Sequence, residues 1–170
     1  MNIYPYTYIY NGKLRTLLWS SSEKDNSDIF LCSNDGNLYK AKGINDAKSK
    51  FESLGFEINW NDGGLVDFDK FWSIVKRLAF SSKTEDCQVV LDGWNFIEDM
   101  VRTYSLHSLR EKLDDLNTNI AYKKIFYVAD IEAFKLVSEE FIPQWSENEL
   151  SKLESDLLYV WSEIGKKIDW

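Results

Sequence analysis

Residues 4–19 read YPYTYIYNGKLRTLLW, and this stretch decides the N-terminal part of the fold. Tyrosine recurs at every second position up to residue 10, which is the period of a β-strand, and Asn11-Gly12 is the strongest short signal for a two-residue hairpin turn. Such a turn fixes the register, and the predicted cross-strand neighbours are Tyr10 with Lys13, Tyr8 with Arg15, Tyr6 with Leu17, and Tyr4 with Trp19. One face of the hairpin then carries a ladder of tyrosines. The other face carries apolar side chains that we assign to the core: Ile3, Ile9, Leu14 and Leu18.

The rest of the first sixty residues predicts more sheet and one short helix. A second hairpin is expected from Asp28–Ser33 and Leu38–Lys42, because the four residues Asn34-Asp35-Gly36-Asn37 between them favour a turn. Apolar residues spaced three and four apart then predict a helix over 44–54, with Asn45 as its N-cap and Gly55 as its terminator. Alternation over Phe56–Trp60 predicts one further strand.

The chain after the break at Asn61–Gly64 has a helical pattern, and we interpret the break as a loop inside one domain. Asp67 is expected to cap a helix with the apolar stripe Phe68, Phe71, Trp72, Val75 and Leu78. Ser108 and Ser146 each open a capping-box pattern, with a glutamate three residues later. Asn117–Asn119 is expected to interrupt the helix that Ser108 begins.

Two segments follow this interruption before the last helix. Residues Ile120–Ile131 fit either a helix or a strand and are assigned to a helix, and Glu132–Phe141 continues helically until Pro143 ends it. The helix after Ser146 has its apolar stripe at Leu150, Leu153, Leu157, Val160 and Ile164. The predicted fold is therefore α+β and a single domain over 1–170. Residues 1–60 form mainly an antiparallel sheet of two hairpins plus one strand, and 65–170 form four to five helices packed on it.

The predicted helix Glu85–Tyr104 is apolar over more than half of its circumference. One stripe consists of Cys87, Val90, Trp94, Ile97, Val101 and Tyr104, and a second of Val89, Gly93, Phe96 and Met100. A helix of this kind is packed on two sides. Glycine at position 93 costs about 1 kcal/mol relative to alanine, which indicates close approach by a neighbouring element. The strip left for solvent is acidic and consists of Glu85, Gln88, Asp92, Asn95 and Asp99.

Net charge is distributed unevenly along the chain. The protein has 170 residues and a net charge of −8, of which residues 1–60 contribute nothing, with seven acids and seven bases. The remaining residues carry 21 acids and 13 bases. An acidic half of this kind argues against nucleic acid or an anionic membrane as direct partner, and it suits a basic protein surface. The composition is that of a globular cytoplasmic protein, since we expect neither a secretory signal at Met1–Tyr10 nor a membrane span.

Residues that could carry chemistry have simpler explanations. The only histidine, His107, precedes a helix, and Cys87 falls on an inward helical stripe, where cysteine behaves as a small hydrophobe. Of the acidic pair Asp67 and Asp69, the first is better explained as a helix cap and the second as a favourable charge on the first turn. We therefore predict no enzymatic activity, no cofactor and no metal.

Aromatic residues beside acidic ones have the anatomy of a binding surface. Phe96 lies at the margin of the acidic strip, either as an exposed anchor or covered by a further helix. Other candidates lie near loops. The residues predicted to contact a partner are Glu85, Asp92, Asn95, Phe96 and Asp99, with Trp60, Asp62, Asp69, Glu139 and Glu140.

The helix around Asp92–Asp99 (DGWNFIED) and the preceding segment Leu65–Phe80 resemble the immunity proteins of bacterial contact-dependent growth inhibition systems. The resemblance extends over the whole chain in general character, and it supplies no residue motif from which a site could be transferred. It implies a protein that binds and neutralises a cognate toxin domain in the same cell. We separately expect the free protein to be a monomer. Many such toxins are nucleases with basic substrate grooves.

Two other classes of function stay open at the level of the sequence. One is an acidic regulatory module that imitates nucleic acid, and the other is an enzyme that uses paired carboxylates. A toxin-encoding reading frame directly upstream favours the immunity protein, a neighbouring transcription or restriction gene favours the mimic, and a divalent ion at Asp67 and Asp69 favours the enzyme.

Overall fold

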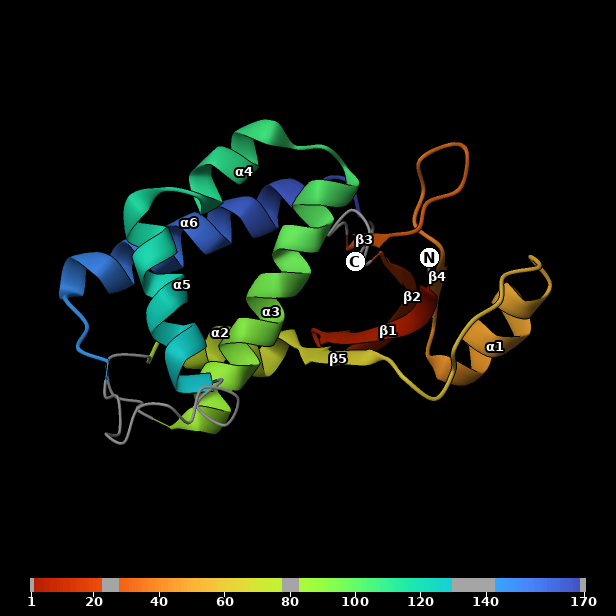
Figure 1. The fold of residues 1–170 in the computed structure, drawn as a ribbon, viewed down its shortest axis with the longest axis horizontal. Helices are drawn as coiled ribbons and strands as arrows, with labels where there is room; N and C mark the ends of the chain where they lie inside the picture. The colour runs from red at the N-terminus through yellow and green to blue at the C-terminus, as the bar shows by residue number, and fades with distance from the viewer. Residues whose placement is uncertain (1, 23–27, 78–82, 130–142, 169–170) are drawn as a thin grey trace.

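The computed structural model describes residues 2–22, 28–77, 83–129 and 143–168, apart from the side chains of 116–118. A small sheet lies at one end of the molecule and a bundle of helices at the other (Figure 1). The elements in chain order are β1 (Asn2–Tyr10), β2 (Lys13–Ser21), β3 (Ile29–Phe30), β4 (Lys40–Ala41), α1 (Ile44–Glu52), β5 (Gly64–Asp67), α2 (Phe68–Val75), α3 (Thr84–Thr103), α4 (His107–Leu113), α5 (Leu116–Ala129) and α6 (Glu147–Gly165). The α+β class is confirmed.

The first hairpin has the register that its turn predicts. Tyr4 lies opposite Trp19, Tyr6 opposite Leu17, Tyr8 opposite Arg15 and Tyr10 opposite Lys13. The turn residues Asn11 and Gly12 both have positive φ, at 50° and 66°, which is the conformation that a tight hairpin turn requires. The Asp69 carboxylate accepts both of their backbone N–H groups, at 2.8 and 2.9 Å, and so ties the turn to α2.

The sheet is mixed, so the prediction of a purely antiparallel sheet is wrong. Its strands lie in the order β3-β2-β1-β5, and β4 also pairs with β2. The strand β5 pairs with β1 in parallel, with Thr7 opposite Leu65. The stretch 56–60 contributes only an isolated bridge between Ile58 and Ile3. The strand β5 begins instead at Gly64, the last residue of the predicted loop. A Cβ on Gly64 would lie 2.4 Å from the Tyr6 ring, so glycine allows the two strands to come together there.

The two strands of the second predicted hairpin, β3 and β4, both pair with β2, and only a short bridge joins the segments between them. The strands β3 and β4 run in the same direction along β2, through the pairs Phe30 with Trp19 and Ala41 with Thr16. The chain between them folds back on itself, with a bridge between Cys32 and Leu38. The predicted segments are thus correct, but their main partner is β2.

Both faces of the first hairpin are covered, and the main core lies under the tyrosine face. Tyr8 and Leu17 are fully buried there against α2 and α3. On the opposite face α1 covers Ile3 and Leu18 in a second, smaller cluster. The assignment of Leu14 to the core is wrong, since its side chain is 41% exposed, and Ile9 is only partly buried. Aromatic rings fill the space between the sheet and the helices α2 and α3. The main core is therefore on the tyrosine face, and not on the aliphatic face as predicted.

The central helix α3 is packed on two sides, as its two apolar stripes predict. Trp94 and Ile97 are buried on one stripe, and Phe96 and Met100 on the other. A Cβ at Gly93 would lie 2.3 Å from the Phe71 ring, which explains the glycine as a point of close approach between α2 and α3.

Two of the predicted helix N-caps are confirmed. Asp67 caps α2 by accepting from the Lys70 N–H at 2.9 Å, and Ser146 forms a complete capping box with Glu149 at the start of α6. Three predicted boundaries are wrong. Gly43, at φ 136°, precedes α1 in place of Asn45. Helix α4 starts after Leu106 without a side-chain cap, and α5 runs through 117–119, because the break falls earlier, near Asp114. Residues 120–129 are helical as assigned, and Glu132–Phe141 lies outside the described residues.

Within the described residues no helix is both long and apolar enough to cross a membrane.

Candidate functional site

Most residues of the acidic strip of α3 are partly or fully buried, and they form hydrogen bonds within the protein. Glu85 and Gln88 are exposed as predicted, and Gln88 donates to the Asp92 carboxylate at 2.8 Å. Asp92 and Asn95 are half-buried, and Asn95 accepts a hydrogen bond from the Tyr122 hydroxyl of α5 at 3.1 Å. The prediction of one continuous solvent-facing strip is therefore wrong, because α5 and the sheet extend over its C-terminal part.

Asp99 is buried, and it joins α3 to the sheet. Its carboxylate accepts from the Trp19 indole N–H at 2.9 Å and from the Arg102 guanidinium at 2.8 Å. Arg102 also donates to the backbone oxygen of Asp28, next to β3. Burial raises the pKa of Asp99 to about 7, although the hydrogen bond from Trp19 and the charge of Arg102 act in the opposite direction.

Phe96 is fully buried, so it is no surface anchor. Of the two readings open at the level of the sequence, the covered one is right, but the cover is the sheet and α2. The ring of Phe96 lies 5.5 to 5.6 Å from those of Tyr6 and Tyr8, and 5.1 Å from that of Phe68. Edge-to-face contacts of this kind build a rigid aromatic core below the open end of the hairpin.

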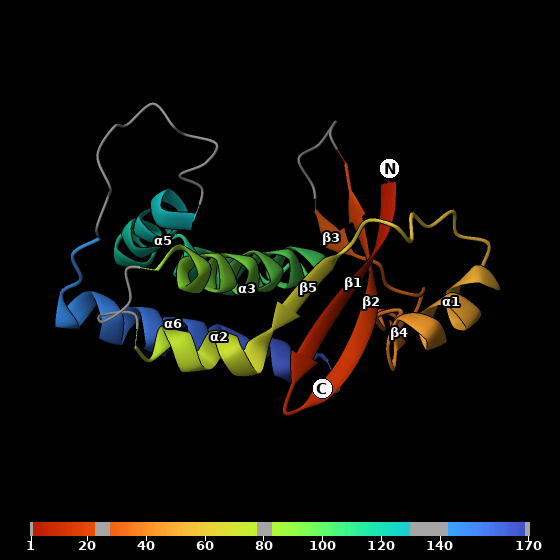
Figure 2. The ribbon, with the colours of Figure 1, turned by 90° about the horizontal axis from the view of Figure 1, so that it is seen from below.

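That open end forms a shallow groove of about 400 Å³ lined by Tyr4, Tyr6, Trp19, Asp62, Gly63 and Gly64. We call it the aromatic groove. It lies where the start of β5 passes the N-terminal half of β1, which runs on beyond α3 (Figure 2). The three aromatic side chains are half-buried, and Tyr4 and Tyr6 both contact Trp19, with ring centroids 5.7 and 6.0 Å apart. The groove therefore presents an ordered apolar surface to solvent.

The walls of the groove are fixed by close packing. A Cβ on Gly63 would lie 2.3 Å from the Pro5 carbonyl oxygen, and one on Gly64 would meet the Tyr6 ring. These two glycines let the backbone before β5 lie directly on β1. Asp62, just before them, is exposed and accepts from the Asn59 amide at 2.6 Å.

Acidic residues lie beside and behind the groove, although the buried Asp99 is also paired with Arg102. Burial raises the pKa of the Tyr6 hydroxyl, and the carboxylates of Asp92 and Asp99 raise it further. Asp62 lies at the rim. Two of the predicted contact residues therefore lie at the groove: Asp62 lines it, and Asp99 accepts a hydrogen bond from Trp19 behind it. The aromatic residues Tyr4, Tyr6 and Trp19 were not selected, although the predicted register already set Tyr4 opposite Trp19.

The other predicted contact residues lie apart from the groove. Asp69 holds the hairpin turn, and Glu85 lies in the first turn of α3. Trp60 is half-buried against the α1 cluster, with the Lys48 ammonium 5.7 Å from its ring centroid. Glu139 and Glu140 lie outside the described residues.

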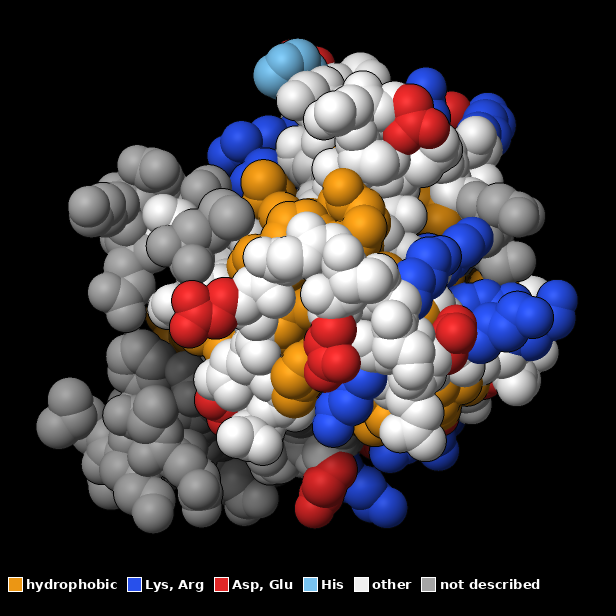
Figure 3. All heavy atoms as spheres, turned by 90° about the vertical axis from the view of Figure 1, so that its right-hand side faces the viewer, with side chains coloured by type: hydrophobic (Ala, Val, Ile, Leu, Met, Phe, Trp, Pro, Cys, Tyr) orange, Lys and Arg blue, Asp and Glu red, His pale blue; other side chains and the backbone are white. Residues whose placement is uncertain are grey.

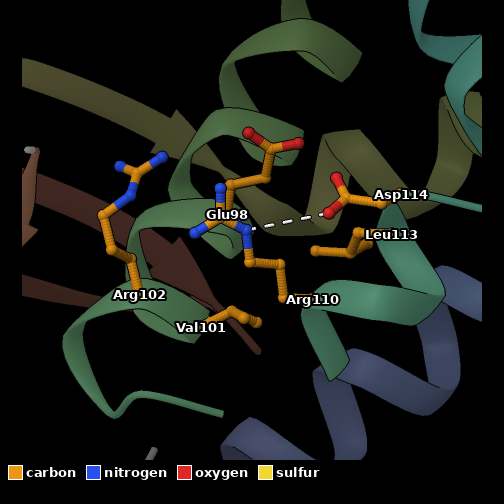
Figure 4. Close-up of a pocket in the computed structure, with 6 residues that line it drawn as sticks. All are labelled: Glu98, Val101, Arg102, Arg110, Leu113 and Asp114. Atoms are coloured by element: carbon orange, nitrogen blue, oxygen red, sulfur yellow. Dashed lines mark ion pairs between the residues drawn. The ribbon is translucent and has the colours of Figure 1, made fainter. Parts of the chain in front are cut away.

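A second hollow lies between α3 and α4, lined by Glu98, Val101, Arg102, Arg110, Leu113 and Asp114 (Figure 4). Its volume is about 50 Å³, which is too small for anything but water or a small ion. Arg110 pairs with Asp114 at 3.7 Å, and Glu98 accepts from the Trp94 indole at 3.1 Å. The charged side chains of this hollow already have partners, since Arg102 pairs with Asp99 outside the lining, so we assign the hollow a structural role.

The surroundings of Cys87 and His107 do not favour a catalytic or metal-binding role. Burial, and to a lesser extent Asp86, raises the pKa of the Cys87 thiol to about 11, which disfavours the reactive thiolate. His107 is exposed at the start of α4. Across the residues that the structure describes, no group of three or more His, Cys, Asp or Glu side chains is arranged to hold a metal ion.

Comparison with known proteins identifies no relative. No family model matches the chain, and no curated protein or solved structure is significantly similar to it.

Proposed function

We propose that this chain is an immunity protein, which binds and neutralises a cognate toxin domain in the cytoplasm of the cell that makes both. The toxin is a protein with a basic surface, such as a nuclease with a basic substrate groove. The observation that carries the proposal is the aromatic groove: half-exposed Tyr4, Tyr6 and Trp19 with Asp62 at the rim and two further carboxylates behind them. Aromatic residues within a charged rim are the usual centre of a protein interface.

The form of the groove favours a protein over a small molecule as ligand. It is shallow and open, whereas small-molecule sites enclose most of the ligand surface. Its aromatic rings rest on the buried Phe96 and on one another, so they lose little freedom on binding. A basic side chain placed over Trp19 or Tyr4 would gain both a cation–π contact and the field of the nearby carboxylates.

The end of the molecule that carries α1 is less suited to a basic partner. Figure 3 shows lysine and arginine side chains on that face together with acidic and apolar ones. Exposed lysines there include Lys42, Lys48 and Lys50. Docking is therefore expected on the groove, on the side of β1 and β5 away from these lysines.

The proposal is tested with the C-terminal domain encoded by the reading frame directly upstream. That domain should arrest growth when expressed alone, and co-expression of this chain should restore growth. Association should slow at high salt, because exposed charges are screened beyond about 8 Å at physiological ionic strength. Failure of the chain to protect the cell, with both proteins expressed, would contradict the proposed function.

A matched pair of charge reversals locates the interface. Asp62→Lys alters the groove rim, and Glu111→Lys makes the same change in net charge on α4, where Glu111 is exposed. We expect Asp62→Lys to slow association about tenfold at low salt, because rim charges act chiefly on the on-rate. Glu111→Lys should leave the rate unchanged. Equal on-rates for the two variants would place the interface elsewhere.

A further inference from the structure

The two edges of the sheet differ in how they are protected. At one edge, the Phe30 N–H of β3 donates to the Thr103 hydroxyl of α3 at 2.8 Å, so a helix covers this strand. At the other edge lies β5, which within the described residues pairs only with β1. In the ribbon views no further described strand lies beside β5 on the side away from β1 (Figures 1 and 2). Within the described residues, no strand pairs with the backbone groups of β5 that point away from β1.

The strand β5 is short, at four residues, but it lacks two features that often discourage edge pairing. Its sequence Gly-Leu-Val-Asp contains neither proline nor lysine. Leu65 is the most exposed large apolar side chain in the described structure, at 62%. By register it lies beside Thr7, on the sheet face that also carries the exposed Leu14.

Acidic residues lie at both ends of this edge. The exposed Asp62 precedes β5, Asp67 ends it and the exposed Asp69 follows it, with Lys70 as the nearest base in sequence. A second copy of the chain paired at this edge would bring two sets of aspartates together, and like charges disfavour that arrangement. An extended segment with basic side chains is attracted by the same residues.

We propose that β5 accepts an extended, basic segment of a partner protein as an additional strand. The inference deepens the proposed function and rests on it, since Gly63 and Gly64 line the aromatic groove and lead directly into β5. Main-chain hydrogen bonds to β5 then add to affinity, while Asp62 and Asp69 select basic side chains and Leu65 selects an apolar one.

The test uses the full chain and a short synthetic peptide in which lysine and valine alternate, and it does not depend on identifying the toxin. The control peptide has the same sequence with N-methyl groups on alternate backbone amides, which removes hydrogen bonds and keeps the charge. We expect the unmodified peptide to bind at least tenfold more tightly, and to slow amide hydrogen exchange in residues 64–67. Leu65→Lys should weaken binding about tenfold by repulsion at the edge, whereas Leu65→Glu should not.

Leu158→Lys on α6 is the matched control for the lysine substitution, because Leu158 is also an exposed leucine. It should leave peptide binding unchanged. Equal binding of the methylated peptide, binding without protection of residues 64–67, or no binding at millimolar concentration would each overturn the edge-strand proposal. Toxin neutralisation by the wild-type chain together with any of these results would leave the proposed function standing and remove only the added strand.

Discussion

The tyrosine face of the first hairpin has two halves, and they differ in what lies above them. Tyr8 packs against Phe68 and Phe96 under α2 and α3 and is fully buried. Tyr4, two pairs along the same face, contacts the Trp19 ring and lines the open groove. The alternating tyrosines thus belong to the core where α2 and α3 cover the sheet, and to the surface where the sheet extends beyond these helices. The periodicity of a strand fixes which face a residue lies on, and the length of the covering helix decides its exposure.

The carboxylates of α3 differ in the same way along the helix. Glu85 is exposed in its first turn, whereas Asp99 near its end is buried between Trp19 and Arg102. Reversing the charge of Asp99 would therefore damage the fold as well as any interface. This makes the exposed Asp62 the better residue for testing partner binding.

The largest effect should come from the covered half. Phe96→Ala removes a ring that contacts four others, those of Tyr6, Tyr8, Phe30 and Phe68, and emptying a buried aromatic site costs about 3–5 kcal/mol of unfolding free energy. Trp94→Ala, on the other buried stripe, should cost a similar amount. Urea denaturation of both variants measures this. A loss below about 1 kcal/mol for Phe96→Ala would mean that the covered half is not rigid core.

A pH effect should come from the boundary between the two halves. The pKa of Asp99 rises on folding from 3.8 to about 7, so between these values the folded protein binds more protons than the unfolded one. This contribution to stability is complete below about pH 4 and is lost as the pH rises through 7. Each tenfold change in acidity corresponds to about 1.4 kcal/mol, so the loss is a few kcal/mol at most.

Asp99→Asn separates this titration from that of other groups. The amide oxygen can still accept from the Trp19 indole, but the side chain no longer titrates. We expect the decline in stability between about pH 4 and 7 to be shallower in the variant, and the variant to be the more stable protein above pH 7. Urea denaturation at several pH values gives the comparison. Parallel stability curves for the two proteins would show that Asp99 does not titrate in this range.

Local signals in the sequence predicted more of the fold than of the site. The turn at Asn11-Gly12, the Asp67 cap and the Ser146 capping box each depend on neighbouring residues, and each is confirmed. The parallel strand β5 was missed because its pairing with β1 joins residues far apart in sequence, and because Gly63 and Gly64 have the same composition as a loop.

The burial of Phe96 and Asp99 depends on which element covers them, and helical periodicity alone does not contain that information. Asp62 could be selected from sequence because it stands beside a loop and an aromatic residue. The predicted register places Tyr4 opposite Trp19, and both residues line the groove. The register does not show that the helices leave this end of the tyrosine face uncovered.

The smallest effect on stability should come from the uncovered half of the tyrosine face, where Tyr4 lies. Tyr4→Ala removes one aromatic contact with Trp19, and such a pair contributes about 0.5–1.5 kcal/mol. The variant should therefore stay folded under conditions that unfold Phe96→Ala. Its affinity for the upstream toxin domain should fall by more than tenfold, because aromatic anchors at the centre of an interface typically contribute at least 2 kcal/mol. Calorimetric titration beside a thermal melt measures both quantities. A Tyr4→Ala protein as unstable as Phe96→Ala would show that the two halves form one core, and normal affinity in a folded variant would remove Tyr4 from the interface.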